Sequence, residues 1–137
     1  MPFQCVIVTP EQQVLDASLK QAILPAHDGL IGILTDHAPL LVKLGTGPLQ
    51  IDPAGGGASS IYFVDGGVAE MKDNRLTILT GEATPVSELS VESAKAEYAE
   101  AAARQPSDKI AAKDRERRME RARVKQRIAG ETTTVKR

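Results

Sequence analysis

The sequence predicts a β plus α chain, with an N-terminal β-sandwich of short strands at residues 1–88 and a C-terminal antiparallel two-helix hairpin at residues 89–137. Short β-branched and aliphatic runs separated by Gly, Pro, Asp and Asn fill the first part, whereas apolar residues recur at helical spacing in the second. The charge changes at the same place. Residues 1–88 carry 4 basic and 10 acidic side chains, a net charge of −6, and residues 89–137 carry 13 and 8, a net charge of +5. Two parts with different roles are therefore expected.

A series of short strands with turns between them is expected in the first part. The run from Arg75 to Thr80 has apolar residues on both faces, as expected where two sheets pack together. Gly66-Gly67 permits unusual backbone angles, and the polar run from Lys72 to Arg75 predicts a hairpin turn. The expected strands are Phe3 to Val8, Ser18 to Leu24, Leu30 to Leu34, Leu40 to Leu44, Pro48 to Asp52, Ile61 to Val64, Gly67 to Met71 and Arg75 to Thr80.

The second part predicts two helices joined near Pro106. Ser87 or Ser90 can cap the first helix, which starts at Val91, and Ser107 or Asp108 can cap the second. The second helix is expected to run to Ala129, with Gly130 as its terminator and residues 131–137 as a polar, frayed tail. Because its apolar stripe consists mostly of small side chains, a docked hairpin should be only marginally favoured over a released one.

The composition excludes several classes of protein. With 42% hydrophobic but only 3% aromatic residues and no Trp, the core must be aliphatic, and the lone Cys5 is expected to be a small core hydrophobe in a reducing compartment. One Cys and two His leave too few ligands for a zinc site, and the loop from Gly55 to Ser60 lacks a phosphate-binding lysine. No membrane span or export leader is recognisable. A soluble chain without catalytic, cofactor or metal residues is expected.

The basic run from Arg115 to Arg127 allows three interpretations. It can be a solvated helix with ion pairs three and four residues apart. It can bind nucleic acid, although no aromatic stacking residues accompany it. It can also dock on an acidic protein surface, and the residues alone do not choose among these.

The segment Gly29 to Leu41, GLIGILTDHAPLL, is a glycine-rich stretch that leads into His-Ala-Pro-Leu. It resembles the corresponding segment of the epsilon family of F-type ATP synthases, and it is the most specific of three such matches. Val6 to Leu15 resembles the family's first strand and turn, and Tyr62 to Glu70 resembles its Gly-Gly strand. The hairpin agrees in length and type rather than in motif.

The resemblance implies a non-catalytic central-stalk subunit that couples proton-driven rotation to ATP synthesis. Its partners would be the gamma subunit, the c-subunit ring and the alpha/beta catalytic head, with membrane association only through the complex. The implied location is the cytoplasmic face of a bacterial plasma membrane, with a plastid thylakoid as the other candidate. The runner-up is a β-sandwich module with a basic nucleic-acid-binding helix. The residues implied to face the ring are Gly29, Leu30, Ile31, His37, Ala38 and Pro39. Leu30 stands where some relatives carry an acidic residue.

The resemblance also implies that the hairpin inhibits ATP hydrolysis by contacting the catalytic head. The basic residues expected to form this contact are Arg117, Arg118, Arg121, Arg123 and Arg127. Some relatives bind ATP through a motif of the type Ile/Leu-Asp-x-x-Arg-Ala at the start of the hairpin. This chain has Leu89-Ser90-Val91-Glu92-Ser93-Ala94, with serine at the acidic and the arginine positions. Weak or absent ATP binding, and no other cofactor, are expected.

Overall fold

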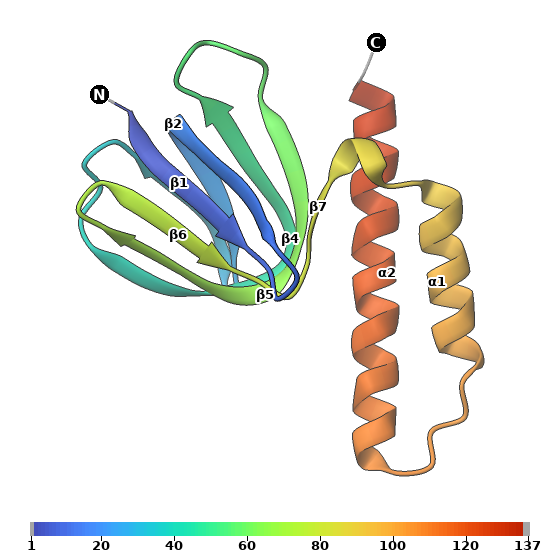
Figure 1. Cartoon of the computed structure of the whole chain (residues 1–137). Coiled ribbons are helices and arrows are strands. Elements are labelled where there is room, and N and C mark those ends of the chain that lie inside the picture. Colours follow the sequence, from blue (N-terminus) through green and yellow to red (C-terminus); the bar gives the residue numbers. More distant parts are fainter. Residues whose placement is uncertain (1, 136–137) are drawn as a thin grey trace. The chain divides into compact units, whose positions relative to one another are not determined.

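The computed structural model describes residues 2–135, and the side chains of residues 2–131. The chain divides into two compact units, residues 1–85 and residues 86–137. The division lies between Pro85 and Val86, slightly before the boundary expected at residue 88. Each unit is a separate structure of the predicted type, strands in the first and helices in the second (Figure 1).

The first unit is built from strands that are longer than expected. In two places, two predicted strands are joined into one continuous strand. The glycine-containing segments between them, Gly45 to Pro48 and Gly66-Gly67, stay paired with each other's strand instead of forming turns. Leu44 lies opposite Gly67, and Thr46 lies opposite Asp65. A short strand before the hairpin was not expected. The strands are β1 (Phe3–Val8), β2 (Gln13–Ala26), β3 (Gly29–Leu34), β4 (Leu40–Pro53), β5 (Ser60–Lys72), β6 (Arg75–Leu79) and β7 (Ala83–Pro85).

The strand pairings close on themselves. β1 lies parallel to β6 and antiparallel to β2, and antiparallel pairs continue from β6 through β5 and β4 back to β2. β3 and β7 flank this circuit on β2 and β5. The expected β-sandwich is therefore confirmed, with its two layers joined in one curled sheet (Figure 1).

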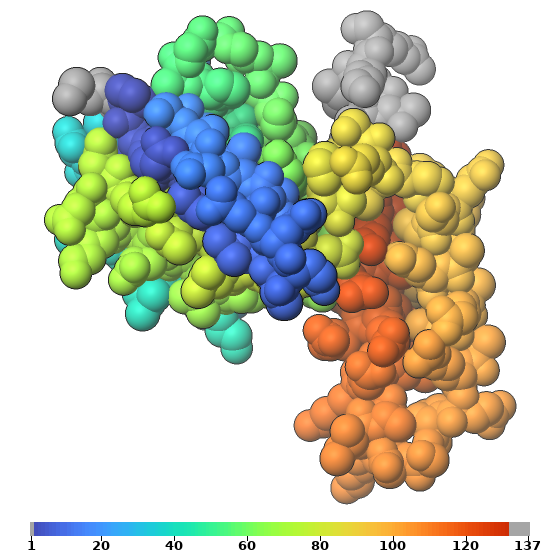
Figure 2. Space-filling model, viewed as in Figure 1, coloured from blue at the N-terminus to red at the C-terminus, as the bar shows by residue number. Residues whose placement is uncertain are grey.

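The core between the layers is mainly aliphatic, as the composition predicts, and it also contains Phe3. Its largest enclosed members include Leu19, Leu24, Ile33 and Ile78, each fully buried, and burial of one such side chain contributes about 1.5–3 kcal/mol. Figure 2 shows the atoms of β1 and β2, in blue, in a band across the near face of this unit, with those of β6, in yellow-green, beside them. Cys5 is fully enclosed in the same core, where burial raises the pKa of its thiol to about 12. The expected small core hydrophobe is confirmed, and its thiol is unreactive.

The predicted hairpin turn between β5 and β6 is present. Lys72 pairs with Arg75, and the two central residues, Asp73 and Asn74, have φ angles of 51° and 57°. Positive φ at both central positions defines a type I′ turn, whose twist matches that of the strands. Asp and Asn suit these positions because their short polar side chains tolerate left-handed backbone better than most residues do.

A buried carboxylate fixes the glycine-rich connection between β4 and β5. Asp52, near the end of β4, is only 6% exposed and accepts hydrogen bonds from Ser59 Oγ and Gln21 Nε2, both at 2.5 Å, and from Gln50 Nε2 at 3.2 Å. The bonds from Ser59 and Gln21 outweigh burial and lower the pKa of the Asp52 carboxyl. The loop is thus a hairpin connection, as expected, with one end tied to the sheet.

Replacing Asp52 with Asn should make the unfolding free energy less dependent on pH. The pKa of Asp52 is lower in the folded chain than the value of about 3.9 expected in the unfolded chain. The ionised Asp52 therefore contributes to the unfolding free energy above about pH 3.9. The contribution is lost as pH falls through the folded pKa. Urea unfolding between pH 2.5 and 7 should show that acid lowers the unfolding free energy of Asp52→Asn less than that of the wild type. At pH 7 the unfolding free energy of Asp52→Asn should be lower than that of the wild type by about 1–3 kcal/mol. Parallel pH curves for the two proteins would contradict this.

The second unit is a helical hairpin. It comprises a 3₁₀ turn, η1 (Val86–Glu88), then α1 (Val91–Ala103) and α2 (Lys109–Val135). Ser90 caps α1 by accepting the Ser93 N–H at 3.0 Å, and Asp108 Oδ1 accepts the Ala111 N–H at 2.7 Å at the start of α2. Both caps are among the predicted alternatives.

The predicted end of the second helix is wrong. Gly130 does not terminate α2, which continues to Val135, so residues 131–135 are helical rather than a frayed tail. Residues 136–137 of the expected tail lie outside the described residues. Glycine inside a helix costs about 1 kcal/mol relative to alanine, a cost that the buried Ile128 and Ala129 immediately before it can offset.

Candidate functional site

The structure separates the residues that were expected to face the ring. Gly29 to Ile31 form the start of β3, whereas His37 to Pro39 lie in the loop after its end. Five residue steps along β3 span about 17 Å. These two groups therefore lie at opposite ends of one strand and do not form a single loop.

An apolar strip runs along the outward face of β3. Leu30 and Leu34 are 69% and 57% exposed, while Ile33 between them points inward and is fully buried. Gly32, also exposed, separates the two leucines. Leu30, Gly32 and Leu34 are called the β3 strip below. Alternation of side chains along the strand places all three on one side.

A second apolar surface lies on the outward face of β4, β5 and β6. Leu41, Val68 and Leu79 are 71%, 41% and 52% exposed. Val68 of β5 pairs with Lys43 of β4 on one side and with Leu79 of β6 on the other. Leu41 lies two residues before Lys43 in β4 and therefore on the same face. These three apolar residues and Lys43 are called the β4–β6 face below. Large apolar side chains clustered on an outer face are typical of a protein-binding surface.

The loop between β3 and β4 connects the two surfaces. It follows Leu34 of the β3 strip and precedes Leu41 of the β4–β6 face. His37 donates its backbone N–H to the Leu34 carbonyl at 3.2 Å, and its Nδ1 lies 2.8 Å from the Ala38 carbonyl oxygen. The imidazole is therefore hydrogen-bonded within a tight turn, while Ala38 and Pro39 are exposed.

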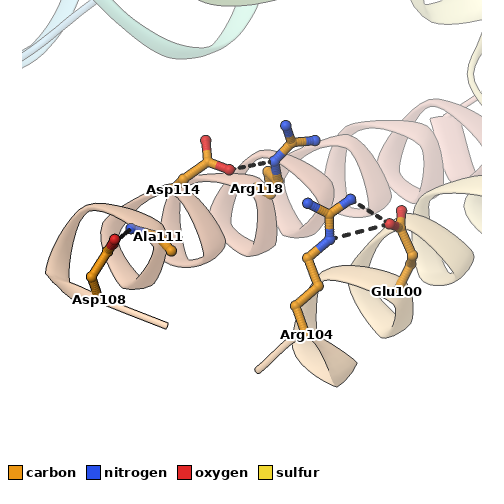
Figure 3. Close-up of polar contacts among 6 residues, drawn as sticks. All are labelled: Glu100, Arg104, Asp108, Ala111, Asp114 and Arg118. Carbon is orange, nitrogen blue, oxygen red and sulfur yellow. Dashed lines mark hydrogen bonds and ion pairs between the residues drawn. The ribbon is translucent and has the colours of Figure 1, made fainter. Parts of the chain in front are cut away.

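The arginines expected on the inhibitory surface all lie in α2, in two different settings. Arg117, Arg118 and Arg127 are exposed, and Arg121 is half-buried. Arg118 pairs with Asp114 at 2.7 Å, and this contact lowers the pKa of the aspartate carboxyl (Figure 3). The helix thus contains ion pairs of the kind that the solvated-helix interpretation predicts, and such exposed pairs contribute less than about 1 kcal/mol.

The fifth arginine takes part in contacts between the helices. The Arg123 guanidinium lies 5.5 Å from the centre of the Tyr98 ring in α1, close enough for a cation–π contact, and pairs with Glu120 at 2.6 Å. Lys125, only 8% exposed, lies 3.4 Å from the Glu97 carboxylate in α1. Basic side chains of α2 therefore hold α1 as well as face solvent. The sequence gives no signal for these contacts, because their partners are 25 and 28 residues apart.

A cavity of about 340 Å³ lies at the turn between α1 and α2. Arg115 donates to the Ala102 carbonyl at 2.8 Å beside it, and Arg104 pairs with Glu100 on α1 (Figure 3). Its lining is Arg104, Gln105, Pro106, Ser107, Ala111, Asp114 and Arg115. Both signs of charge line the cavity. Within residues 2–135, no group of three Cys, His, Asp or Glu could hold a metal ion.

The geometry defines a class of protein that works by assembly. Exposed apolar surfaces on the sandwich and a basic helix provide contacts for other chains rather than a catalytic centre. Of the described helices, none is long and apolar enough to cross a membrane.

Comparison with known proteins identifies the family. Residues 2–86 match the family model described as the ATP synthase delta/epsilon chain, beta-sandwich domain. The ATP synthase epsilon chain of Rhodopirellula baltica is 40% identical over 101 residues, which cover 74% of this chain and 77% of that protein. The chloroplastic epsilon chain of Emiliania huxleyi is 36% identical over 96 residues, 70% of this chain and 72% of that one. The chain belongs to the ATP synthase delta/epsilon family, a family of non-catalytic subunits.

A solved structure agrees in fold. A chain in the Euglena gracilis mitochondrial ATP synthase structure, which contains OSCP, F1 and c-ring, superposes with a TM-score of 0.76. The superposition covers 95% of this chain and 79% of that chain at 22% sequence identity. The likeness therefore includes the helical hairpin, for which the family model gives no match.

Proposed function

We propose that this chain is the coupling subunit of the central stalk, which transmits proton-driven rotation of the c ring to the catalytic head. The observation that carries the proposal is the exposed apolar surface of the sandwich. Five large apolar side chains of the described sandwich are more than 40% exposed, and all five belong to the β3 strip or the β4–β6 face. Burial of such side chains in an interface is the main source of binding free energy between subunits.

The two surfaces suit two different partners. We assign the β4–β6 face to the gamma subunit, because its three apolar side chains are accompanied by the charged Lys43, as in an interface with a polar rim. We assign the β3 strip to the c ring, where the contact at Leu30 would be apolar. Of the other residues expected at the ring, Gly29 lies at the start of the same strand, whereas Ile31 packs against the core. The loop with His37, Ala38 and Pro39 joins the two surfaces and would lie at the border between these partners.

Separate substitutions test the two assignments in the assembled complex. Leu41→Asp should weaken binding to the gamma subunit by at least about tenfold, because it places a charge in the apolar interface. Leu34→Asp, in the β3 strip, should leave gamma binding intact and reduce ATP-driven proton pumping relative to ATP hydrolysis. Both side chains are exposed in the chain itself, so its urea midpoint should stay unchanged.

The control is Gln13→Asp, which adds the same charge at an exposed polar position of β2. It should alter neither gamma binding nor pumping. Wild-type gamma affinity in Leu41→Asp would overturn the assignment of the β4–β6 face, and wild-type pumping in Leu34→Asp would overturn that of the β3 strip.

The membrane that carries the complex follows from the same proposal. Epsilon-chain relatives come from bacteria and from chloroplasts. We propose a peripheral position on the cytoplasmic face of a bacterial plasma membrane, reached only through the complex. A plastid thylakoid is the other location that the relatives support.

The helical hairpin would act as a regulator of hydrolysis. Arg117, Arg118, Arg121, Arg123 and Arg127 would meet acidic segments of the catalytic head and block ATP hydrolysis. The structure supports this through the exposure of four of these arginines, Arg117, Arg118, Arg123 and Arg127, on one long helix. Arg118 and Arg123 would exchange their present partners, Asp114 and Glu120, for carboxylates of the head. Since exposed pairs are weak, that exchange costs little.

Binding of ATP to the free chain should be weak or absent. Ser90 replaces the acidic residue of the nucleotide motif, and its side chain is the N-cap of α1. Ser93 replaces the arginine of that motif and has no positive charge to bind a phosphate. Isothermal titration of the full chain with ATP and magnesium should therefore show no saturable heat at micromolar concentrations. A micromolar dissociation constant would contradict the expectation.

A further inference from the structure

The side chain of Asn74 links three separate segments at one end of the sandwich. Its Oδ1 accepts the backbone N–H of Asp36 at 2.8 Å, in the loop between β3 and β4. Its Nδ2 donates to the backbone carbonyl of Pro2 at 3.0 Å, ahead of β1. Its own carbonyl accepts the Gln4 N–H at 3.2 Å. The tip of the β5–β6 turn is thus tied to the loop and to the first strand.

The chemistry of these contacts requires an amide side chain. One partner is a backbone N–H and the other is a backbone carbonyl, so the side chain must accept and donate at once. Aspartate would keep the acceptor but place a second acceptor against Pro2. The backbone of Asn74 is also left-handed, a conformation that asparagine tolerates better than most residues.

The two hydrogen bonds of His37 described above join residues of this loop and its immediate neighbour, whereas the bond to Asn74 joins the loop to another segment. Asp36 has a φ angle of 59°, a conformation that costs free energy for a non-glycine residue. Ala38 and Pro39, which follow, are exposed. Because the hydrogen bond from Asp36 ties the loop to the β5–β6 turn, it influences where the loop lies relative to the rest of the sheet.

We propose that Asn74 is a positioning residue that sets the conformation of the loop Asp36 to Pro39 and thereby the contact this loop makes with the rotor. The inference rests on the proposed function, which places that loop at the border of the gamma and c-ring surfaces. Asn74 itself need not touch either partner.

The neighbouring residue offers a matched control. Asp73 occupies the other central position of the same turn, also with positive φ, and its exposed side chain makes none of the three contacts above. Glycine suits both positions of a type I′ turn. Asn74→Gly therefore removes the side-chain contacts while keeping the turn, and Asp73→Gly changes the turn equally without touching the loop.

Hydrogen exchange of the full chain, measured residue by residue by NMR, tests the positioning. In Asn74→Gly the exchange of the Asp36 amide should accelerate at least about tenfold, because its acceptor is gone, while amides in the centre of β5 stay as protected as in the wild type. In Asp73→Gly the Asp36 amide should exchange as in the wild type. Equal Asp36 exchange in the two variants would overturn the inference.

Coupling in the assembled complex tests the function of the positioned loop. The ratio of ATP-driven proton pumping to ATP hydrolysis should fall about twofold in Asn74→Gly and stay unchanged in Asp73→Gly. Faster Asp36 exchange with a normal ratio would overturn the placement of the loop at the rotor contact, which belongs to the proposed function. Unchanged exchange would overturn the role of Asn74 itself, so the two failures are distinguishable.

Discussion

Replacing Gly67 with alanine is expected to unfold most of the sandwich unit or to destabilise it by more than about 4 kcal/mol. A Cβ atom at this position would lie 2.0 Å from the Leu79 carbonyl oxygen and 2.8 Å from Thr80 Cα, both in the main chain beside β5. The φ angle of 114° is a further obstacle, because residues with a side chain rarely adopt it. Relief of the clash would require β5 and β6 to separate at the Val68–Leu79 end of their pairing, which is part of the closed circuit. Most domains have only about 5–15 kcal/mol of stability to lose.

Gly66 provides the matched control for this substitution. It also has a positive φ angle, 69°, but a Cβ atom there would meet no atom within 4 Å. Gly66→Ala should therefore cost only the backbone term of about 1–2 kcal/mol. Urea unfolding followed by circular dichroism measures both variants. If Gly67→Ala has a midpoint close to that of Gly66→Ala, the close approach of β5 to the Leu79 carbonyl is not rigid.

The sequence predicted the strands well where local residues decide them. Phe3 to Val8 was placed within its observed bounds because a continuous apolar run is bounded by Thr9-Pro10. The glycines of β4 and β5 were interpreted as breaks, since glycine usually marks a turn. In the structure they continue the strands, and Gly67 does so because a side chain does not fit there. Such a requirement depends on the neighbouring strand and is invisible in local sequence.

The surfaces of the candidate site were only partly predictable. Alternation along β3 indicates that Leu30 and Ile31 face opposite sides, but not which side is covered. The parallel pairing of β1 with β6, about 70 residues apart, decides the layers and has no local signal. The basic helix was recognised from composition, whereas its contacts with Glu97 and Tyr98 needed the packing of α1 on α2.

Removal of the helical hairpin is expected to raise ATP hydrolysis by the assembled complex severalfold, while the sandwich remains bound. A chain that ends at Pro85 keeps β7 paired with β5 and removes the whole second unit, which begins at the buried Val86. The sandwich retains its own core. Steady-state ATPase of the complex, with the full-length and the shortened chain at equal occupancy, measures the effect. An unchanged rate would show that the hairpin does not inhibit.

A narrower substitution distinguishes the arginines from the bulk of the hairpin. Arg117, Arg118 and Arg121 changed together to Gln keep the helix, because Gln is a good helix former, but remove the charge that an acidic segment of the head would meet. This triple variant should recover most of the rise seen on truncation. The control, Arg104→Gln, neutralises an exposed arginine that pairs with Glu100 at the turn and should leave the rate at the wild-type value. If truncation activates but the triple variant does not, the hairpin inhibits by its bulk, and the charge difference between the two units has another purpose.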